Sequence, residues 1–156
     1  MRPKKKPVVC MDGLRVVFQT KTGPVVGVDS LSFSIFPGET VCLVGESGSG
    51  KSVSSLALMR LTEYSGGKIE SGKVLFYSDS EKGKNLIGET QNNMRKIRGN
   101  EIGMVFQEPM TALNPVFTIS RQLTEGLRIH QGLNKIAAEK EALELLRKVR
   151  IPEPER

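Results

Sequence analysis

The chain has 156 residues, of which 38% are hydrophobic and 26% charged. These proportions exclude a disordered acidic chain, and no apolar run approaches the ~18 residues that a membrane-spanning helix needs. A net charge of +6 is a feature of many nucleic-acid-binding proteins, but four of the basic residues lie within the first six positions. The chain also has no Trp and few other aromatic side chains that could stack on bases. We therefore expect no nucleic-acid partner.

The first part of the chain is predicted to consist mostly of strands. Residues 1–12 are interpreted as a basic N-terminal tail. β-Branched and aromatic residues predict a strand over 14–18, and alternation of apolar and polar residues predicts another over 31–36, with one face buried. Residues 41–44 are apolar without alternation, which is typical of a strand covered on both faces in an α/β core.

The remainder is predicted to alternate between helices and short strands. Apolar residues at helical spacing predict helices over 51–61, 118–131 and 135–150, and a cluster of basic residues indicates a short helix or turn over 94–98. Short apolar runs predict strands over 73–77 and 101–106, and the polar residues 78–93 are interpreted as a variable surface segment. In the last helix, one stripe is expected to face a core, formed by Ala138, Ala142, Leu145 and Val149.

One segment carries a pattern with a chemical meaning. Between the predicted strand 41–44 and the predicted helix 51–61, the chain matches G-x-x-x-x-G-K-[ST] with Gly45, Glu46, Ser47, Gly48, Ser49, Gly50, Lys51 and Ser52. The glycines allow backbone N–H groups to point inward and form an anion nest at a helix N-terminus, where the helix dipole also favours phosphate. The Lys51 ammonium can lie between the β- and γ-phosphates of a nucleotide, and the Ser52 hydroxyl can ligate Mg²⁺.

Two longer runs are similar to the ATPases of ABC transporters. Residues 38–52 resemble their Walker A region and residues 104–115 resemble their Q-loop. The second run reads Glu-Pro-Met-Thr-Ala-Leu-Asn-Pro over 108–115, which resembles the importers for dipeptides, oligopeptides, nickel and, most closely, glutathione. The resemblance implies an α/β P-loop NTPase fold with an antiparallel β subdomain, the start of a RecA-like core and part of a helical subdomain.

The resemblance also implies roles for individual residues. ATP would be held by residues 45–52, and Gln107 would contact the metal or its water, so that Ser52 and Gln107 are the implied Mg²⁺ ligands. Phe18, 27 residues before Gly45, falls where the family places an aromatic ring that stacks on adenine. A Phe in an alternating strand is also a common core residue, so both roles remain open for Phe18.

Several elements that the family needs for hydrolysis do not follow Gln107 in this sequence: a Leu-Ser-Gly-Gly-Gln signature, a Walker B strand ending in Asp-Glu, and a switch histidine. No residue is therefore assigned as the catalytic base. We interpret residues 13–156 as the N-terminal part of an ATP-binding domain that is cut short, and expect this chain alone not to hydrolyse ATP.

The family resemblance further implies partners and a location. Transporter membrane subunits would dock on residues 108–115, a second ATPase subunit would complete a head-to-tail dimer, and a substrate-binding protein would take part indirectly. The implied location is the cytoplasmic face of a bacterial inner membrane. Two cysteines, Cys10 and Cys42, cannot make a disulfide framework, which fits a reducing compartment.

Two other functions remain open at this point. A stand-alone P-loop kinase for a small molecule would be complete at this length, but only the basic cluster 95–98 resembles the lid and acceptor elements of such an enzyme. A non-catalytic fragment could instead bind ATP or the membrane subunits without turnover. Phosphate transfer to an added acceptor would identify the kinase.

Overall fold

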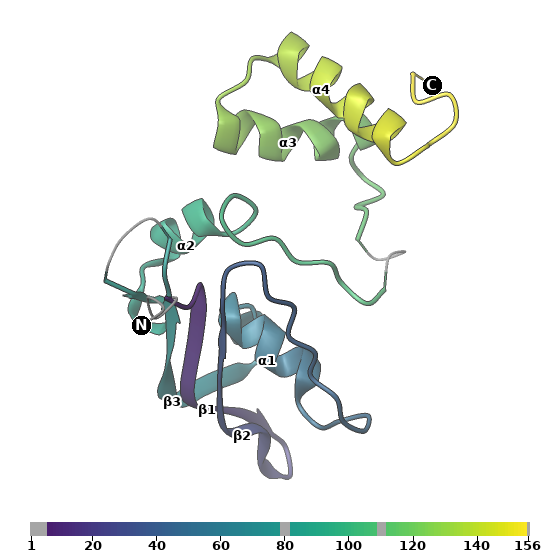
Figure 1. The fold of residues 1–156 in the computed structure, drawn as a ribbon. Helices are drawn as coiled ribbons and strands as arrows, with labels where there is room; N and C mark the ends of the chain where they lie inside the picture. Colours follow the sequence, from purple (N-terminus) through teal and green to yellow (C-terminus); the bar gives the residue numbers. More distant parts are fainter. Residues whose placement is uncertain (1–5, 79–81, 109–111, 156) are drawn as a thin grey trace. The chain divides into compact units, whose positions relative to one another are not determined.

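The computed structural model describes residues 6–78, 82–108 and 112–155. They belong to two compact units that divide after Met94. The first unit is built on a four-stranded antiparallel sheet with strand order β2-β1-β3-β4, in which β1 lies between β2 and β3 (Figure 1). The second unit contains two consecutive helices that pack on each other.

The sheet confirms the strands predicted over 14–18 and 31–36, and extends them. Its members are β1 (Val9–Thr20), β2 (Gly23–Ile35), β3 (Gly67–Phe76) and β4 (Lys84–Asn85). Because β1 begins at Val9, the last four residues that we assigned to the basic tail belong to the sheet. The strand predicted over 73–77 begins six residues earlier than expected, at Gly67.

A glycine with positive φ explains why the strand predicted from the sequence is shorter than β3. Gly72 has φ of +99°, and a Cβ at this position would lie 2.6 Å from the carbonyl oxygen of Gly13. The pairing of β1 with β3 shifts register between Asp12 and Arg15, opposite this glycine. Gly72 therefore lets the two backbones approach at an irregular position within a continuous strand, where sequence patterns predict a loop.

The described residues of the predicted polar surface segment 78–93 are mostly exposed, as predicted, but one of them belongs to the core. Leu86 is completely buried, at the start of a 3₁₀ turn, η2 (Leu86–Gly88). The side-chain oxygen of Asn85 accepts hydrogen bonds from the backbone N–H groups of Val74 and Ile87, both at 3.3 Å. This amide holds the turn against β3, so a single leucine in a polar run becomes part of the core. Part of the predicted segment, residues 79–81, lies outside the described residues.

The strands predicted over 41–44 and 101–106 are wrong for this chain. Neither run is part of a strand, and the side chains of Val44 and Val105 are 91% and 97% exposed. A strand exists only through hydrogen bonds to a neighbour, and among the described residues the four strands of the sheet pair with one another. Apart from one isolated bridge between Arg98 and Ile102, these apolar runs have no pairing partner in the described part of the chain.

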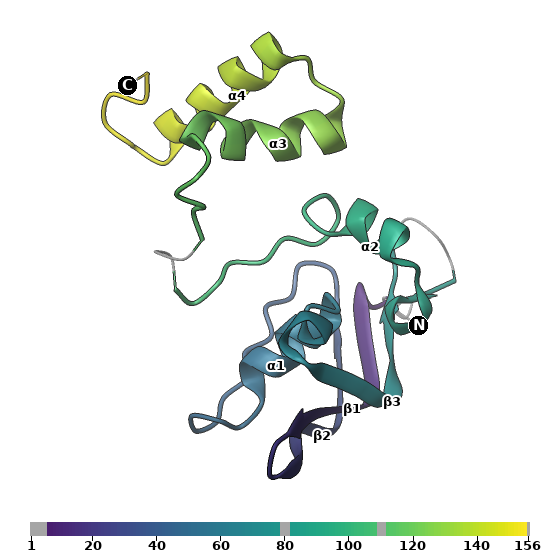
Figure 2. The ribbon, with the colours of Figure 1, turned by 180° about the vertical axis from the view of Figure 1, so that it is seen from behind.

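The first unit also contains one helix beside the sheet. This helix, α1 (Lys51–Leu58), lies next to the strands in both views (Figures 1 and 2) and is followed by the 3₁₀ turn η1 (Thr62–Ser65). Its buried residues are Ser54 and Ala57. The prediction of a helix starting at Lys51 is confirmed, and the helix ends three residues earlier than predicted. A further short helix, α2 (Gln91–Ile97), shows that the segment predicted as a basic helix or turn over 94–98 is mostly helical.

The second unit contains the two amphipathic helices predicted near the end of the sequence. They are α3 (Ile119–Gln131) and α4 (Lys135–Lys148). Thr118 and Asn134 cap them, because each side chain accepts a hydrogen bond from a backbone N–H in the following turn, and Gly132 ends α3 with φ of +67°. No helix among the described residues has the length and apolar character required to cross a bilayer.

Only half of the predicted stripe on α4 is buried. Ala138 and Ala142 pack with Leu127 of α3 in a small core, with 0%, 5% and 8% of their surfaces exposed. Leu145 and Val149 are 42% and 68% exposed, which contradicts our prediction for them. The helix α3 therefore covers the stripe only in the first two turns of α4, and the last two residues of the stripe face solvent.

The buried centre of the sheet leads to a prediction for stability. Leu14 is 0% exposed, whereas Val25 on the outer strand β2 is 51% exposed. We expect Leu14→Ala to lower the free energy of unfolding by about 2–4 kcal/mol, because it leaves a cavity in the core. Val25→Ala, the control, should change it by about 0.5 kcal/mol or less. Urea unfolding measures both values, and equal effects of the two substitutions would contradict the described packing.

Candidate nucleotide-phosphate site

The loop over residues 45–50 joins the run 41–44, which has no regular secondary structure, to the first residue of α1. Two of its glycines have left-handed backbone conformations, with φ of +82° at Gly48 and +87° at Gly50. A Cβ at Gly50 would also collide with the carbonyl oxygen of Gly27 in β2. Only glycine fits at Gly50 on both grounds, so the loop rests directly on the backbone of the sheet where the helix begins.

The same glycine is fixed from the helix side. The carbonyl oxygen of Gly50 accepts hydrogen bonds from the backbone N–H of Ser54 at 2.8 Å and from its hydroxyl at 2.9 Å. Ser54 is 3% exposed, so its hydroxyl has a buried partner rather than water. The end of the loop is thus held between β2 and the first turn of α1. This is a rigid base for the backbone N–H groups that precede it.

The N-terminus of α1 has the electrostatic character of an anion site. No side chain caps it, and no acidic residue lies in its first turn. The positive end of the helix dipole is therefore not neutralised by the protein itself. Ser52 lies in this first turn and is exposed, so its hydroxyl is available as a ligand. A cavity of about 450 Å³ adjoins the helix start and is lined by Lys51 and Ser52 together with apolar residues such as Phe33 and Ile35.

Lys51, the first residue of α1, turns its side chain back into the loop. Its ammonium donates hydrogen bonds to the carbonyl oxygen of Gly45 at 2.8 Å, to that of Glu46 at 2.5 Å, and to the hydroxyl of Ser49 at 3.1 Å. The cationic group therefore lies beside the backbone that would surround a phosphate. The loop, the ammonium and the exposed Ser52 hydroxyl together supply donors and positive charge suited to a polyphosphate.

These residues also fit a magnesium ion that is shared with a bound phosphate. Within the described ranges, no group of three or more His, Cys, Asp or Glu side chains could hold a metal by itself. Mg²⁺ commonly takes one or two protein oxygens and completes its octahedron with water and phosphate oxygens. Ser52 offers one such oxygen, so the site suits a metal that arrives with its nucleotide.

Phe18 is placed by packing within the sheet. Its ring lies against two glycines, Gly27 on β2 and Gly67 on β3, because a Cβ at either position would come within 2.7 Å of a ring atom. The ring is half-buried on β1. Spacing along the sequence gave no indication that Gly27 touches both this ring and Gly50, so Gly27 is a residue of the site that sequence reasoning missed. The adenine-stacking role of Phe18 stays a prediction.

Gln107 belongs to the second unit and the phosphate loop to the first, so the structure describes each of them in its own surroundings. Gln107 is exposed and lines a cavity of about 430 Å³ with Phe106, Glu108 and Ala112. Its role as a metal ligand therefore stays a prediction. Three residues of the run predicted to dock on membrane subunits, 109–111, lie outside the described residues.

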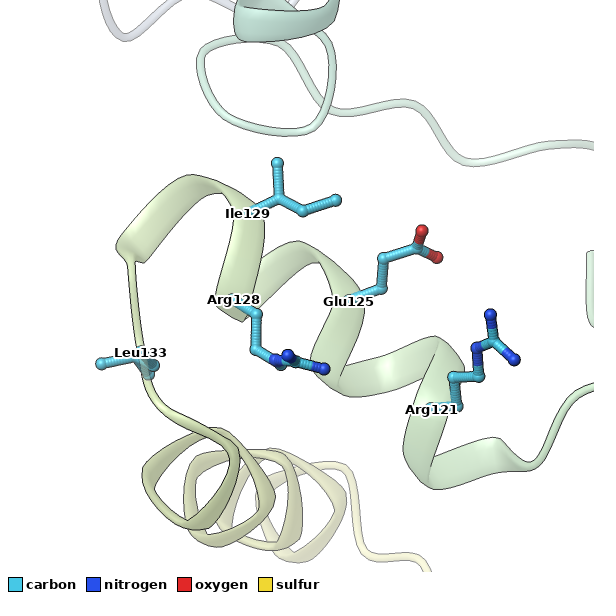
Figure 3. Close-up of a pocket in the computed structure, with 5 residues that line it drawn as sticks. All are labelled: Arg121, Glu125, Arg128, Ile129 and Leu133. Atoms are coloured by element: carbon cyan, nitrogen blue, oxygen red, sulfur yellow. The ribbon is translucent and has the colours of Figure 1, made fainter.

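A separate cavity of about 400 Å³ lies on α3 and contains none of the predicted site residues. Its lining side chains project from one helix and the following loop, as Figure 3 shows for Arg121, Glu125, Arg128, Ile129 and Leu133. The guanidinium of Arg121 lies 4.1 Å from the ring centroid of Phe117, a cation–π contact. Nothing in this cavity resembles the loop-and-helix geometry of residues 45–52.

Comparison with known proteins shows which family contains a chain of this kind. Residues 28–156 match the family model described as ABC transporter. The chain is 47% identical over 152 residues to a putative peptide import ATP-binding protein of Brucella abortus, covering 97% of this chain and 45% of that protein. It is 48% identical over 153 residues to the glutathione import ATP-binding protein GsiA of Pectobacterium atrosepticum, covering 98% of this chain and 24% of that protein. The chain thus spans less than half the length of these relatives.

The fold comparison agrees with the sequence comparison. A solved structure of the ATP-binding cassette MJ0796, described as a post-hydrolysis state bound to ADP and Pi, superposes with a TM-score of 0.75 at 25% identity, covering 93% of this chain and 58% of that one. The dimeric structure of the same bacterial ABC transporter cassette gives a TM-score of 0.73. The family expectation drawn from the Walker A and Q-loop runs is confirmed: the chain belongs to the ABC transporter family and has the P-loop NTPase fold of its ATP-binding cassettes.

Proposed function

We propose that this chain is the N-terminal part of the ATP-binding subunit of an ABC importer, which couples ATP binding and hydrolysis to the uptake of peptides such as dipeptides, oligopeptides or glutathione. The observation that carries the proposal is the loop over residues 45–50, with Lys51 at the uncapped start of α1. The names of the relatives, peptide import and glutathione import ATP-binding proteins, support the substrate class. The partial ATP-binding domain would begin with β1 at Val9, and the residues before it would be its basic tail.

ATP and Mg²⁺ are the proposed cofactors. The backbone N–H groups of residues 45–52 would donate to phosphate oxygens, and the Lys51 ammonium would neutralise part of their charge. The Ser52 hydroxyl would contribute one oxygen to Mg²⁺, with Gln107 as the second protein ligand. Bound Mg²⁺ would supply charge neutralisation between the terminal phosphates. The side chains of this chain thus bind and orient, and none of them is proposed as the general base.

The remaining partners follow from the same proposal. Residues 108–115 would face transporter membrane subunits at the cytoplasmic face of a bacterial inner membrane, and a second ATPase subunit would pair head-to-tail with this one. The dimeric cassette structure of MJ0796 supports such pairing. A substrate-binding protein would take part only through the membrane subunits. The alternative of a small-molecule kinase has less support. A kinase would not account for the run 104–115, and this run lies within the segment that is similar to peptide import ATP-binding proteins.

The contribution of Lys51 can be measured by nucleotide binding. We expect Lys51→Ala to weaken Mg-ATP binding by about 10- to 100-fold, because hydrogen bonds to a charged group are each worth about 1.5–3 kcal/mol. Isothermal titration calorimetry measures the dissociation constant, and the shift in melting temperature at fixed Mg-ATP provides a second readout. Lys21→Ala, in the exposed turn after β1, is the matched control and should bind like the parent. Equal binding by both variants would contradict the proposed site.

Turnover separates the importer proposal from the kinase alternative. We expect the purified 156-residue chain to bind Mg-ATP without hydrolysing it above background, because no Asp follows Gln107 in the sequence to serve in a Walker B strand. A phosphate-release assay with and without a panel of small-molecule hydroxyl acceptors tests this expectation. Hydrolysis that disappears in Lys51→Ala would show that the chain is catalytically sufficient. Phosphate transfer to an acceptor would instead establish a kinase.

The two roles of Phe18 can be distinguished with two ligands. We expect Phe18→Leu to weaken ATP binding about fivefold or more through lost stacking, while inorganic tripolyphosphate, which has no base, binds as it does to the parent. Leucine keeps an apolar side chain against Gly27 and Gly67, so the sheet packing is largely retained. Equal changes for ATP and tripolyphosphate would show that the ring acts only in packing.

A further inference from the structure

The turn that ends α1 has an arginine at a position where glycine is usual. The backbone N–H of Arg60 donates to the carbonyl oxygen of Ala57 at 3.0 Å, and that of Leu61 donates to the carbonyl oxygen of Leu56 at 2.8 Å. This pair of hydrogen bonds closes a helix with a left-handed residue, and Arg60 has φ of +52°. At the end of α3 the chain has Gly132 in this role. A left-handed arginine is unfavourable for the backbone, so an interaction of its side chain must compensate.

The guanidinium of Arg60 makes that interaction. Only 12% of its side chain is exposed. Its Nε and Nη2 atoms donate to the two carboxylate oxygens of Glu63 in η1, at 2.7 and 3.1 Å, in a fork that suits a planar guanidinium. Its Nη1 atom donates to the carbonyl oxygen of Glu89 and lies 3.5 Å from that of Leu86 in η2. The end of α1 is therefore bound to backbone 26 and 29 residues further along the chain.

Further hydrogen bonds extend this contact to the start of α2. The side-chain amide of Gln91 donates to the carboxylate of Glu63 at 3.2 Å and accepts from the hydroxyl of Tyr64 at 3.4 Å. The side-chain amide of Asn93 donates to the carboxylate of Glu89 at 2.7 Å. All of these residues belong to the first unit. One set of polar contacts thus joins the end of α1 and η1 to η2 and the first turn of α2.

The position of α1 depends strongly on what holds its two ends. The helix has eight residues, of which only Ser54 and Ala57 are buried, and a helix this short has little stability of its own. Its N-terminal end is fixed through Gly50, which rests on β2. Arg60 fixes its C-terminal end. Lys51 and Ser52, the first two residues of α1, therefore lie on a short rod that is held at both ends.

We propose that Arg60 is a positioning residue for the nucleotide site. Its guanidinium binds the C-terminal end of α1 to η2, and so keeps the N-terminal end, with Lys51 and Ser52, in the place that a polyphosphate requires. This inference rests on the proposed function and deepens it, because it adds a residue that acts on the same site. Eight helical residues span about 12 Å, so Arg60 acts through the helix and not by contact with phosphate.

The first test needs no nucleotide. Amide hydrogen exchange, followed residue by residue with NMR, compares the amides within α1 with those of β1. We expect Arg60→Met to speed exchange in α1 about tenfold relative to β1, because local opening of the helix no longer breaks the fork to Glu63. Arg15→Met is the matched control and should leave this ratio unchanged. Arg15 also donates to two carboxylates, those of Asp29 and Glu70, but these contacts lie within the sheet and are more exposed.

A second variant separates the guanidinium from the backbone conformation. Arg60→Gly accommodates the left-handed turn without cost, so it keeps the helix end folded, but it lacks the fork. We expect it to show the same increase in α1 exchange as Arg60→Met.

The other arm measures the affinity for Mg-ATP and for inorganic tripolyphosphate by calorimetry. We expect Arg60→Met to weaken both about fivefold, because the donors at the start of α1 no longer stay aligned with phosphate oxygens, which both ligands share. Arg15→Met should bind like the parent. Leu14→Ala, which lowers the stability of the sheet, should also keep the parent's affinity at a temperature where it is folded, so that loss of stability and loss of positioning are told apart.

Three results would overturn the proposal. The first is a ratio of α1 to β1 exchange in Arg60→Met and Arg60→Gly that equals the parent's. The second is unchanged affinity in Arg60→Met despite faster exchange in α1. The third is a loss of affinity in Leu14→Ala as large as that in Arg60→Met. If the parent itself binds neither ligand, the proposed function fails, and the exchange arm still decides whether Arg60 fixes α1.

Discussion

The contact between Gly50 and the backbone of β2 is the constraint on which the candidate site depends. It fixes the end of the loop against Gly27 with no side chain in between, and the two hydrogen bonds from Ser54 hold it from the helix side. With that point fixed, α1 can begin at Lys51 with an uncapped positive end. Lys51 and Ser52 are the first two residues of the helix that begins at this junction, which places both beside the loop.

The same junction links the loop to the antiparallel sheet rather than to a parallel core. Gly27 carries both contacts, one to Gly50 and one to the ring of Phe18, so β2 connects the phosphate loop with the aromatic residue 27 positions before it. The apolar run 41–44 leads into the loop without regular secondary structure, and it pairs with no strand among the described residues. Within the described residues, the loop is held by its contact with β2 and by its hydrogen bonds to the first turn of α1.

Sequence patterns predicted those features that depend on local chemistry. The start of α1, the helices α3 and α4, and the strands β1 and β2 each have their signals within a few residues, and each is confirmed. Features that depend on a partner distant in the sequence were predicted less well. Residues 41–44 and 101–106 have strand composition but no neighbour, and Leu86 is buried because Asn85 binds the backbone of β3, which no local pattern reveals. For the site, spacing identified residues 45–52, whereas the contacts of Gly27 and the internal bonds of Lys51 required the three-dimensional structure.

The central claim is that the backbone N–H groups between residues 45 and 52 form a cradle for a nucleotide's phosphates. The most direct measurement is a titration of the ¹⁵N-labelled chain with Mg-ATP, followed through its amide resonances by NMR. The account predicts that the largest shifts occur at the amides of Gly48, Gly50, Lys51 and Ser52, and that inorganic tripolyphosphate reproduces them. Saturating Mg-ATP that leaves these amides unshifted, or shifts that cluster elsewhere in the chain, would contradict it.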